Sequence, residues 1–138
     1  MLKVEGERLV AYKDTKGIWT IGVGHTGPDV HEGLRITQEA SRRFLAADAL
    51  EACRAVDRLV RVPLTANQRD ALASFVFNLG ASRLLSSTLL RLLNRGDYAS
   101  VPRELARWNK ETLKDGTVRT NDGLTNRRAA EIDLWNTP

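Results

Sequence analysis

The sequence predicts an α+β fold in which a small N-terminal antiparallel β-sheet lobe is joined by a long helix to a larger helical C-terminal lobe. Two observations carry this prediction. Residues that alternate between apolar and polar flank a Lys16-Gly17 turn near the N-terminus, as in a β-hairpin. Beyond residue 37, apolar residues recur at helical spacing between Gly, Pro and Asp-Gly turn signals. The length of 138 residues corresponds to a single domain, 1–138.

The β-containing lobe is expected to occupy about residues 1–36. Strands are predicted over residues 8–13 and 18–23, and residues 34–36 are a candidate third short strand. These segments together would form the small antiparallel sheet.

A linking helix is predicted over about residues 37–60. Thr37 is a suitable N-cap, and the apolar residues that follow it keep roughly helical spacing. The only cysteine, Cys53, lies inside this pattern and has no second cysteine to pair with. We therefore expect it to be a small buried apolar residue.

The helical lobe is expected to occupy about residues 61–138. Thr65 and Gln68 stand three positions apart and form a capping-box sequence for a helix over residues 66–79, which Gly80 would end. This helix is apolar on most faces, which is typical of a buried helix.

Further helices are predicted over about residues 87–94 and 100–108, the second with a proline in its first turn. Residues 109–124 contain two Asp-Gly turn signals and few apolar residues, which favours a hairpin-like loop. Thr125 is the predicted cap of a last helix that runs to Trp135.

The chain is basic, with 21 Lys and Arg against 17 Asp and Glu and a net charge of +4. This charge favours binding to polyanions, either nucleic acid or the anionic polymers and lipids of bacterial surfaces. The basic residues are spread among acidic ones, whereas a nucleic-acid-binding helix clusters them, so no nucleic acid partner is expected. No run of 18 apolar residues occurs, so no stable membrane insertion is expected either.

The segment from Glu5 to His25 contains the residue types that cleavage of a glycosidic bond needs. One protonated carboxyl must donate a proton to the leaving oxygen, and one ionised carboxylate must activate water or stabilise the cationic sugar. Apolar neighbours would keep Glu5 protonated, whereas Asp14 in a solvated turn would stay charged. Thr20 would offer a hydroxyl that positions the water.

Spacing alone does not establish this site. In a chain with 28% charged residues, a Glu and an Asp at these positions are by default solvated surface charges. Thr20 by itself is typical of a strand, and His25 by itself is typical of a structural hydrogen-bonding residue.

The order of the residues is more informative. Glu5 is followed by Tyr-Lys-Asp before a glycine turn and by Trp-Thr-Ile-Gly-x-Gly-His after it. This pattern resembles the phage-type lysozymes, glycoside hydrolase family 24. Further segments resemble the same family in the same order, along nearly the whole chain: residues 64–80, 87–108 and 123–131. The resemblance implies a lysozyme-like fold.

Carried over by position, the resemblance implies that Glu5 is the catalytic acid, Asp14 the second carboxylate and Thr20 the residue that positions water. It also implies that His25 lies in the cleft and pairs with Asp48 in a structural, partly buried contact.

The resemblance places three further residues at the substrate. Phe77 and Asn78 would line the cleft, and Arg127 would approach the catalytic Glu, with Arg128 as the alternative one residue further on. Phe77 is equally well accounted for as a core residue, and either arginine as a surface charge at a helix end.

The implied function is that of a phage endolysin, which hydrolyses the β-1,4 bond between N-acetylmuramic acid and N-acetylglucosamine in peptidoglycan for host cell lysis. The resemblance implies a monomer, without metal or cofactor, that inverts the sugar, although a retaining path is open if the two carboxyls lie about 5 Å apart. Two alternatives remain. One is a non-catalytic peptidoglycan-binding relic of the fold, and the other is a lytic transglycosylase, in which Asp14 and Thr20 would have no role.

Only four residues precede Glu5, so the acid is expected on a short helix whose placement depends on docking to the rest of the protein. The chain resembles family members that wait in the host cytoplasm for a holin pore, or members that have lost an N-terminal signal-arrest segment.

Overall fold

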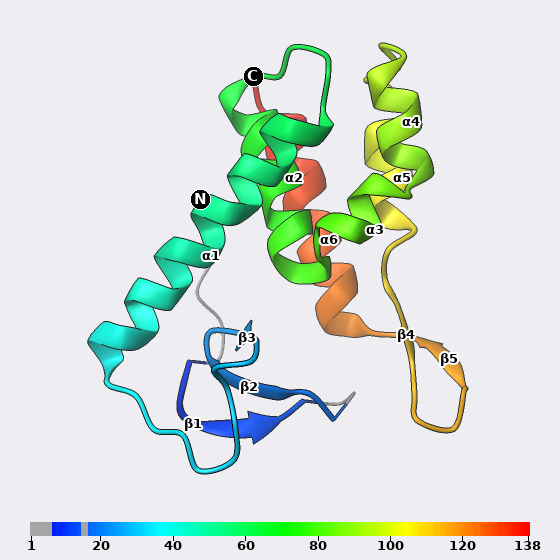
Figure 1. Ribbon diagram of the computed structural model, residues 1–138. Helices are drawn as coiled ribbons and strands as arrows, with labels where there is room; N and C mark the ends of the chain where they lie inside the picture. The colour runs from blue at the N-terminus through cyan, green and yellow to red at the C-terminus, as the bar shows by residue number, and fades with distance from the viewer. Residues whose placement is uncertain (1–6, 15–16) are drawn as a thin grey trace. The chain divides into compact units, whose positions relative to one another are not determined.

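The computed structural model describes residues 7–14 and 17–138 (Figure 1). Contacts between residues divide the described chain into two compact units, one up to residue 50 and one over residues 51–138, and the boundary falls within the longest helix. The mixed α+β architecture confirms the predicted fold class. In chain order the elements are β1 (Arg8–Lys13), β2 (Trp19–Gly22), β3 (His25–Thr26), α1 (Gln38–Leu59), α2 (Ala66–Leu79), α3 (Ala81–Leu85), α4 (Thr88–Asn94), α5 (Val101–Ala106), β4 (Lys110–Thr112), β5 (Val118–Thr120) and α6 (Asp122–Trp135).

The first unit contains an antiparallel sheet in the order β1-β2-β3. The predicted hairpin of β1 and β2 is confirmed, with Tyr12 opposite Thr20. The third strand is β3, not residues 34–36, because the chain reverses at once after β2 through glycines with positive φ. Residues 34–36 instead lie along β1, which they join through backbone hydrogen bonds and a single bridge between Val10 and Arg35.

Gly22, at the end of β2, is held close to α1. Its φ is +64°, and a Cβ added to it would lie 3.1 Å from the side-chain oxygen of Ser41, which is fully buried. Only glycine combines this backbone conformation with this close approach at low cost.

Gly22→Ala is expected to lower the free energy of unfolding by about 2 kcal/mol, because left-handed backbone strain and overpacking add together. Gly24→Ala is the matched control, since Gly24 also has a positive φ (+73°) but an added Cβ would meet no atom within 4 Å. It should lower the free energy of unfolding by only about 1 kcal/mol. Urea unfolding of both variants measures the difference, and equal losses would show that the contact with Ser41 is unimportant.

The start of α1 confirms the predicted cap. The Thr37 hydroxyl accepts a hydrogen bond from the backbone N–H of Ala40 at 3.1 Å. This contact satisfies one of the backbone donors that a helix start leaves without a partner. Cys53, further along α1, packs against the core but is only partly buried, so the expectation of a small buried apolar residue holds in part.

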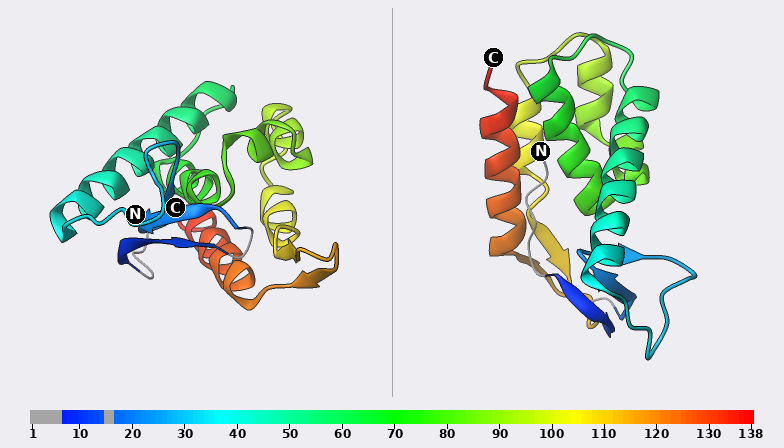
Figure 2. Two further views of the ribbon diagram at one scale, coloured as in Figure 1. Left: turned by 60° about the horizontal axis from the view of Figure 1, so that its bottom comes forward. Right: turned by 90° about the vertical axis from the view of Figure 1, so that its left-hand side faces the viewer.

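The second unit is built around α2, which packs against α3 and α6 (Figure 2). The predicted capping box is present, since Thr65 accepts from the N–H of Gln68 at 3.1 Å and Gln68 accepts from the N–H of Thr65 at 2.9 Å. Gly80 follows the last residue of the helix, also as predicted. The core of this unit consists of apolar side chains that are completely or almost completely buried, among them Leu72, Phe75, Leu84, Leu89, Leu93, Val101, Leu105 and Trp135.

Two expectations for this unit are wrong. The segment after Gly80 is not a plain connection but the short helix α3, whose five residues are too few for a helical period to be recognised. The last helix is capped by Asn121, not Thr125, because the Asn121 side chain accepts from the N–H of Leu124 at 2.9 Å. The Asp-Gly pair that indicated a turn therefore lies in the first turn of α6.

The segment between α5 and α6 confirms the hairpin-like interpretation, since β4 and β5 pair in antiparallel fashion. Pro102 lies in the first turn of α5, as predicted. Within the described ranges, no helix has both the length and the apolar character needed to cross a membrane.

Candidate active site

Asp14 and Thr20, the two described candidates for catalysis, are fixed to the same residue in the hairpin of β1 and β2. The Asp14 carboxylate accepts a hydrogen bond from the backbone N–H of Ile18 at 2.9 Å. The Thr20 hydroxyl donates to the carbonyl oxygen of Ile18 at 3.0 Å. The third candidate, Glu5, lies outside the described residues.

These contacts determine what each group can offer to a ligand. Thr20 is buried, with 4% of its surface exposed, and its single hydroxyl proton is already donated to Ile18. Its oxygen can therefore act only as an acceptor toward a further partner. Asp14 also accepts hydrogen bonds when ionised, so the two side chains present acceptor atoms.

His25 is held between two carboxylates in the same unit. Its Nδ1 lies 2.9 Å from Oδ2 of Asp48, and its Nε2 lies 3.1 Å from Oδ2 of Asp29. The ring also stacks on Phe44, with ring centres 4.2 Å apart and an interplanar angle of 5°. The hydrogen bond between His25 and Asp48 confirms the pairing that the resemblance implied.

The two carboxylates favour the charged form of His25, because an ionised carboxylate only accepts hydrogen bonds and both ring nitrogens must then carry protons. Partial burial opposes this charge, but the hydrogen bonds and negative charges of Asp48 and Asp29 outweigh it and raise the pKa of His25 above 6.5. The same interaction with His25 lowers the pKa of Asp29.

The stability of the protein is expected to fall as the pH rises above about 6.5. The folded state binds the His25 proton more tightly than the unfolded state does. The stabilisation is therefore complete below the unfolded pKa and is lost as the pH rises through the folded pKa. Thermal unfolding at several pH values between about 6 and 9 measures the decrease.

His25→Gln should remove most of this pH dependence. His31→Gln is the matched control, because His31 is exposed and its Nδ1 contacts only the nearby carbonyl oxygen of Glu32 among the described residues. A His25→Gln variant that kept the full decrease would assign the titration to another group.

Asp29 and Phe44 were not predicted as partners of His25. A local signal exists for each. Asp29 follows His25 by four positions across a glycine turn, and Phe44 precedes Asp48 by four positions on α1, so that both lie on one helix face.

Asn78, one of the predicted residues of the second unit, contacts a buried ion pair. Arg128 and Glu131 are 1% and 2% exposed. Nη2 of Arg128 donates to Oε2 of Glu131 at 2.9 Å and to Oδ1 of Asn78 at 2.9 Å. Ser74 also donates to Oε2 of Glu131, at 2.7 Å. Nε of Arg128 and Oε1 of Glu131 lie 2.7 Å apart, as an ion pair without hydrogen-bond alignment.

Burial is the largest cause of the pKa shifts of Arg128 and Glu131. Loss of solvent lowers the pKa of Arg128 and raises the pKa of Glu131, while the attraction between the two charges opposes both shifts. The Arg128 side chain is buried and cannot reach a ligand in solvent, whereas the Arg127 side chain is partly exposed. Phe77 is partly buried and packs against the hydrophobic core.

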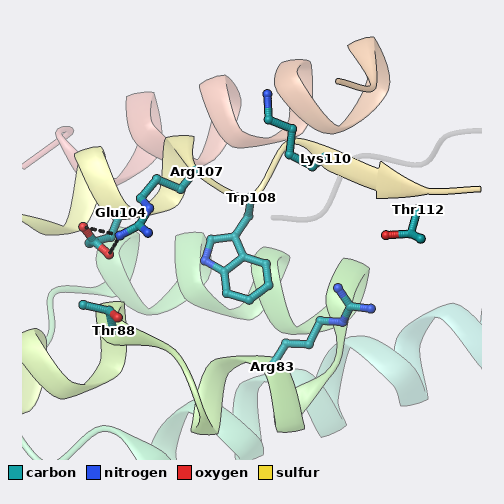
Figure 3. A pocket seen from close by; sticks show the side chains of 7 residues that line it. All are labelled: Arg83, Thr88, Glu104, Arg107, Trp108, Lys110 and Thr112. Carbon is teal, nitrogen blue, oxygen red and sulfur yellow. Dashed lines mark hydrogen bonds and ion pairs between the residues drawn. The ribbon is translucent and has the colours of Figure 1, made fainter. Parts of the chain in front are cut away.

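A cavity of about 350 Å³ lies in the second unit (Figure 3). The Trp108 indole stands between Arg83 and the ion pair of Glu104 with Arg107, whose Nη1 donates to Glu104 at 3.1 Å. The remaining lining side chains are Thr88, Lys110 and Thr112.

The cavity is positively charged. Glu104 neutralises Arg107, but Lys110 donates only to a hydroxyl, that of Thr120, at 2.8 Å, and Arg83 has no acidic partner in the part of the chain that the structure describes. An aromatic face beside cations and hydroxyls suits a polar ligand that carries negative charge. Spacing along the sequence does not predict this cavity, because its lining residues come from α3, α4, α5, the two residues after α5 and β4, which only the fold brings together.

Comparison with known proteins identifies the family. The phage lysozyme family matches residues 2–131. A SAR-endolysin of Escherichia phage Mu is 41% identical over 136 residues, covering 99% of this chain and 76% of that protein.

Solved structures agree with the sequence comparison. The muramidase domain of SpmX from Asticaccaulis excentricus has a TM-score of 0.85 at 38% identity and covers 98% of this chain and 90% of that chain. An endolysin from the Escherichia coli O157:H7 phage FAHEc1 has a TM-score of 0.83 at 38% identity, covering 96% of this chain and 85% of that one. The chain therefore belongs to the phage lysozyme family, and it is a peptidoglycan hydrolase of the lysozyme type that lyses the bacterial cell wall.

Proposed function

We propose that this protein is an N-acetylmuramidase, which hydrolyses the β-1,4 bond between N-acetylmuramic acid and N-acetylglucosamine. The observation that carries this proposal is the pair of acceptors in the first hairpin, since Asp14 and Thr20 are both hydrogen-bonded to Ile18. A hydrolase needs such acceptors to orient water, whereas a lytic transglycosylase does not.

The proposed reaction is a single displacement with inversion. The attacking water donates one hydrogen bond to Asp14 and one to the Thr20 oxygen, which leaves a lone pair directed at the anomeric carbon. Glu5 donates its proton to the leaving glycosidic oxygen while Asp14 takes a proton from the water. One proton is donated by Glu5 and one is accepted by Asp14, so the protons balance, and no metal or cofactor takes part.

In this proposal, residues of the second unit bind the substrate. Asn78 and Phe77, at the end of α2, contact the sugar chain, and Arg127 is the arginine that supports the catalytic acid. The cavity beside Trp108 contributes a positively charged surface for a wall polymer whose peptides carry carboxylates.

Analysis of the reaction products tests the bond and the mechanism together. Purified peptidoglycan is digested in water enriched in ¹⁸O, and the released ends are identified by mass spectrometry after reduction. A reducing muramic acid end that contains ¹⁸O is the expected product. A reducing glucosamine end would assign the other glycosidic bond, anhydro ends would indicate a transglycosylase, and binding without products would indicate a non-catalytic wall-binding protein.

We also propose that the protein acts as an endolysin, which is present in the host before lysis and reaches the wall through a holin pore or after release from an N-terminal membrane anchor. The similarity to a phage Mu protein named SAR-endolysin supports this proposal. Expression in host cells with and without a holin, followed by the optical density of the culture, distinguishes the two routes.

A further inference from the structure

Arg128 and Glu131 are two charged residues in the interior of the second unit, where charges are unusual. Both side chains are almost completely buried, where the loss of solvent is costly and an apolar pair of similar volume would pack equally well. A fold that only needed to join α2 and α6 would not require these charges. The pair therefore has consequences beyond packing.

The contact with Asn78 determines how its amide is oriented. A guanidinium has only donors, so Arg128 must face the carbonyl oxygen of Asn78, and the two are 2.9 Å apart. The NH₂ group of Asn78 then points away from Arg128. Asn78 is partly exposed at the last turn of α2, and its NH₂ group has no acceptor among residues 7–14 and 17–138.

The guanidinium itself is held on several sides. Glu131 contacts it at 2.7 and 2.9 Å, and Ser74 fixes the shared carboxylate oxygen. Its carbon lies 5.2 Å from the ring centre of Phe75, and Nη1 donates to the carbonyl oxygen of Trp108 at 3.4 Å. With these contacts Arg128 cannot rotate away, so the orientation of the Asn78 amide is set before any ligand arrives.

We propose that Arg128 is a positioning residue, which turns the Asn78 amide so that its NH₂ group donates to an amide carbonyl oxygen of the substrate. This inference rests on the proposed function, in which Asn78 contacts the wall polymer. Peptidoglycan offers such carbonyls in the acetamido groups of its sugars and in its peptides. Glu131 and Ser74 act through Arg128, because they hold the guanidinium in the required place.

The double variant Arg128→Met/Glu131→Leu tests this role, since it removes both charges and keeps the volume. A merely structural pair would be replaced without loss, so KM would stay unchanged. The positioning role instead predicts normal folding, an increase in KM of about three- to tenfold and a smaller change in kcat. Unfolding curves and kinetics on purified peptidoglycan measure the two properties separately.

Asn78 variants test the direction of the hydrogen bond. Asn78→Asp keeps an oxygen toward Arg128 but cannot donate outward, so it should raise KM at least as much as Asn78→Ala does. Both substitutions should have little effect in the background of the double variant. A parental KM in Asn78→Asp, or the same loss in both backgrounds, would overturn the proposal. If the double variant does not fold, Asn78→Asp alone still tests the proposal, because a parental KM in that variant would overturn it.

Binding to insoluble peptidoglycan, measured by sedimentation, separates this inference from the proposed chemistry. If the parent releases no muramic acid ends but its Kd for the wall still depends on Asn78 and Arg128, the proposed reaction fails and the positioning role stands. If products are formed and neither Kd nor KM responds, the positioning role fails. Repeating the Asn78→Ala measurement on peptide-free glycan identifies the carbonyl, since a loss that persists there assigns an acetamido group.

Discussion

Glu5→Gln is expected to slow the clearing of bacterial wall suspensions by about a hundredfold or more. The amide has nearly the same size as the carboxyl, but it cannot give a proton to the leaving glycosidic oxygen. The turbidity of a wall suspension, followed at equal concentrations of folded enzyme, measures the rate. Clearing as fast as that of the parent would remove Glu5 from the role of the acid.

Glu7→Gln is the matched control for this variant. Glu7 lies two residues further along and accepts hydrogen bonds from Ser41 at 2.7 Å and from Gln38 at 3.4 Å, so its carboxylate has structural partners on α1. Its substitution should change activity much less than that of Glu5. The same loss in both variants would indicate damage to the N-terminal segment instead of loss of a catalytic acid.

Asp14→Asn extends the test to the proposed base. An asparagine oxygen can still accept from the N–H of Ile18, so the turn should be preserved, but the amide cannot take a proton from water. We expect a loss of activity of about a hundredfold or more without loss of folding. A variant that remained active would favour a mechanism in which Asp14 is not the base.

Glu131→Leu alone is expected to lower the free energy of unfolding by about 3 to 5 kcal/mol. The substitution leaves the Arg128 guanidinium buried without its counterion, and it leaves the Ser74 hydroxyl without its acceptor. Adding Arg128→Met should restore most of the loss, because no buried charge then remains. Urea unfolding of the single and double variants measures both effects.

The pair of Asp57 and Arg69 provides the control for burial. It has two hydrogen bonds of 2.7 Å, but its side chains are 54% and 41% exposed. Asp57→Leu should therefore cost less than about 1 kcal/mol. Similar losses for Asp57→Leu and Glu131→Leu would show that burial is not what makes the interior pair sensitive to the loss of one partner.

Local chemistry explains which elements could be predicted. The caps of α1 and α2 can be predicted because Thr37, and Thr65 with Gln68, bind backbone groups within three positions. The cap of α6 was placed wrongly because Asn121 and Thr125 are both plausible caps, and the choice depends on where β5 ends. The short helix α3 was missed because five residues carry no recognisable period.

For the site, the family resemblance predicted residue contacts that spacing along the sequence could not predict. It led to the contact between His25 and Asp48, which are 23 positions apart and carry no local signal for one another. It also left open whether Arg127 or Arg128 is the arginine associated with the catalytic acid. Only packing shows that Arg128 is buried against Asn78 and Glu131, which leaves Arg127 as the candidate arginine of the site.

The sequence by itself determined the α+β class, most element boundaries, the family and the candidate carboxylates, because these depend on short-range periodicity, caps and ordered motifs. The tertiary structure alone decided which polar groups are buried and what they face. In the folded protein the Thr20 hydroxyl donates to the carbonyl oxygen of Ile18, and His25 contacts two carboxylates. The Asn78 amide contacts the buried ion pair through Arg128. The physical reason is that the strength and direction of a polar interaction depend on the local loss of solvent and on partners distant in the chain, which spacing along a sequence does not encode.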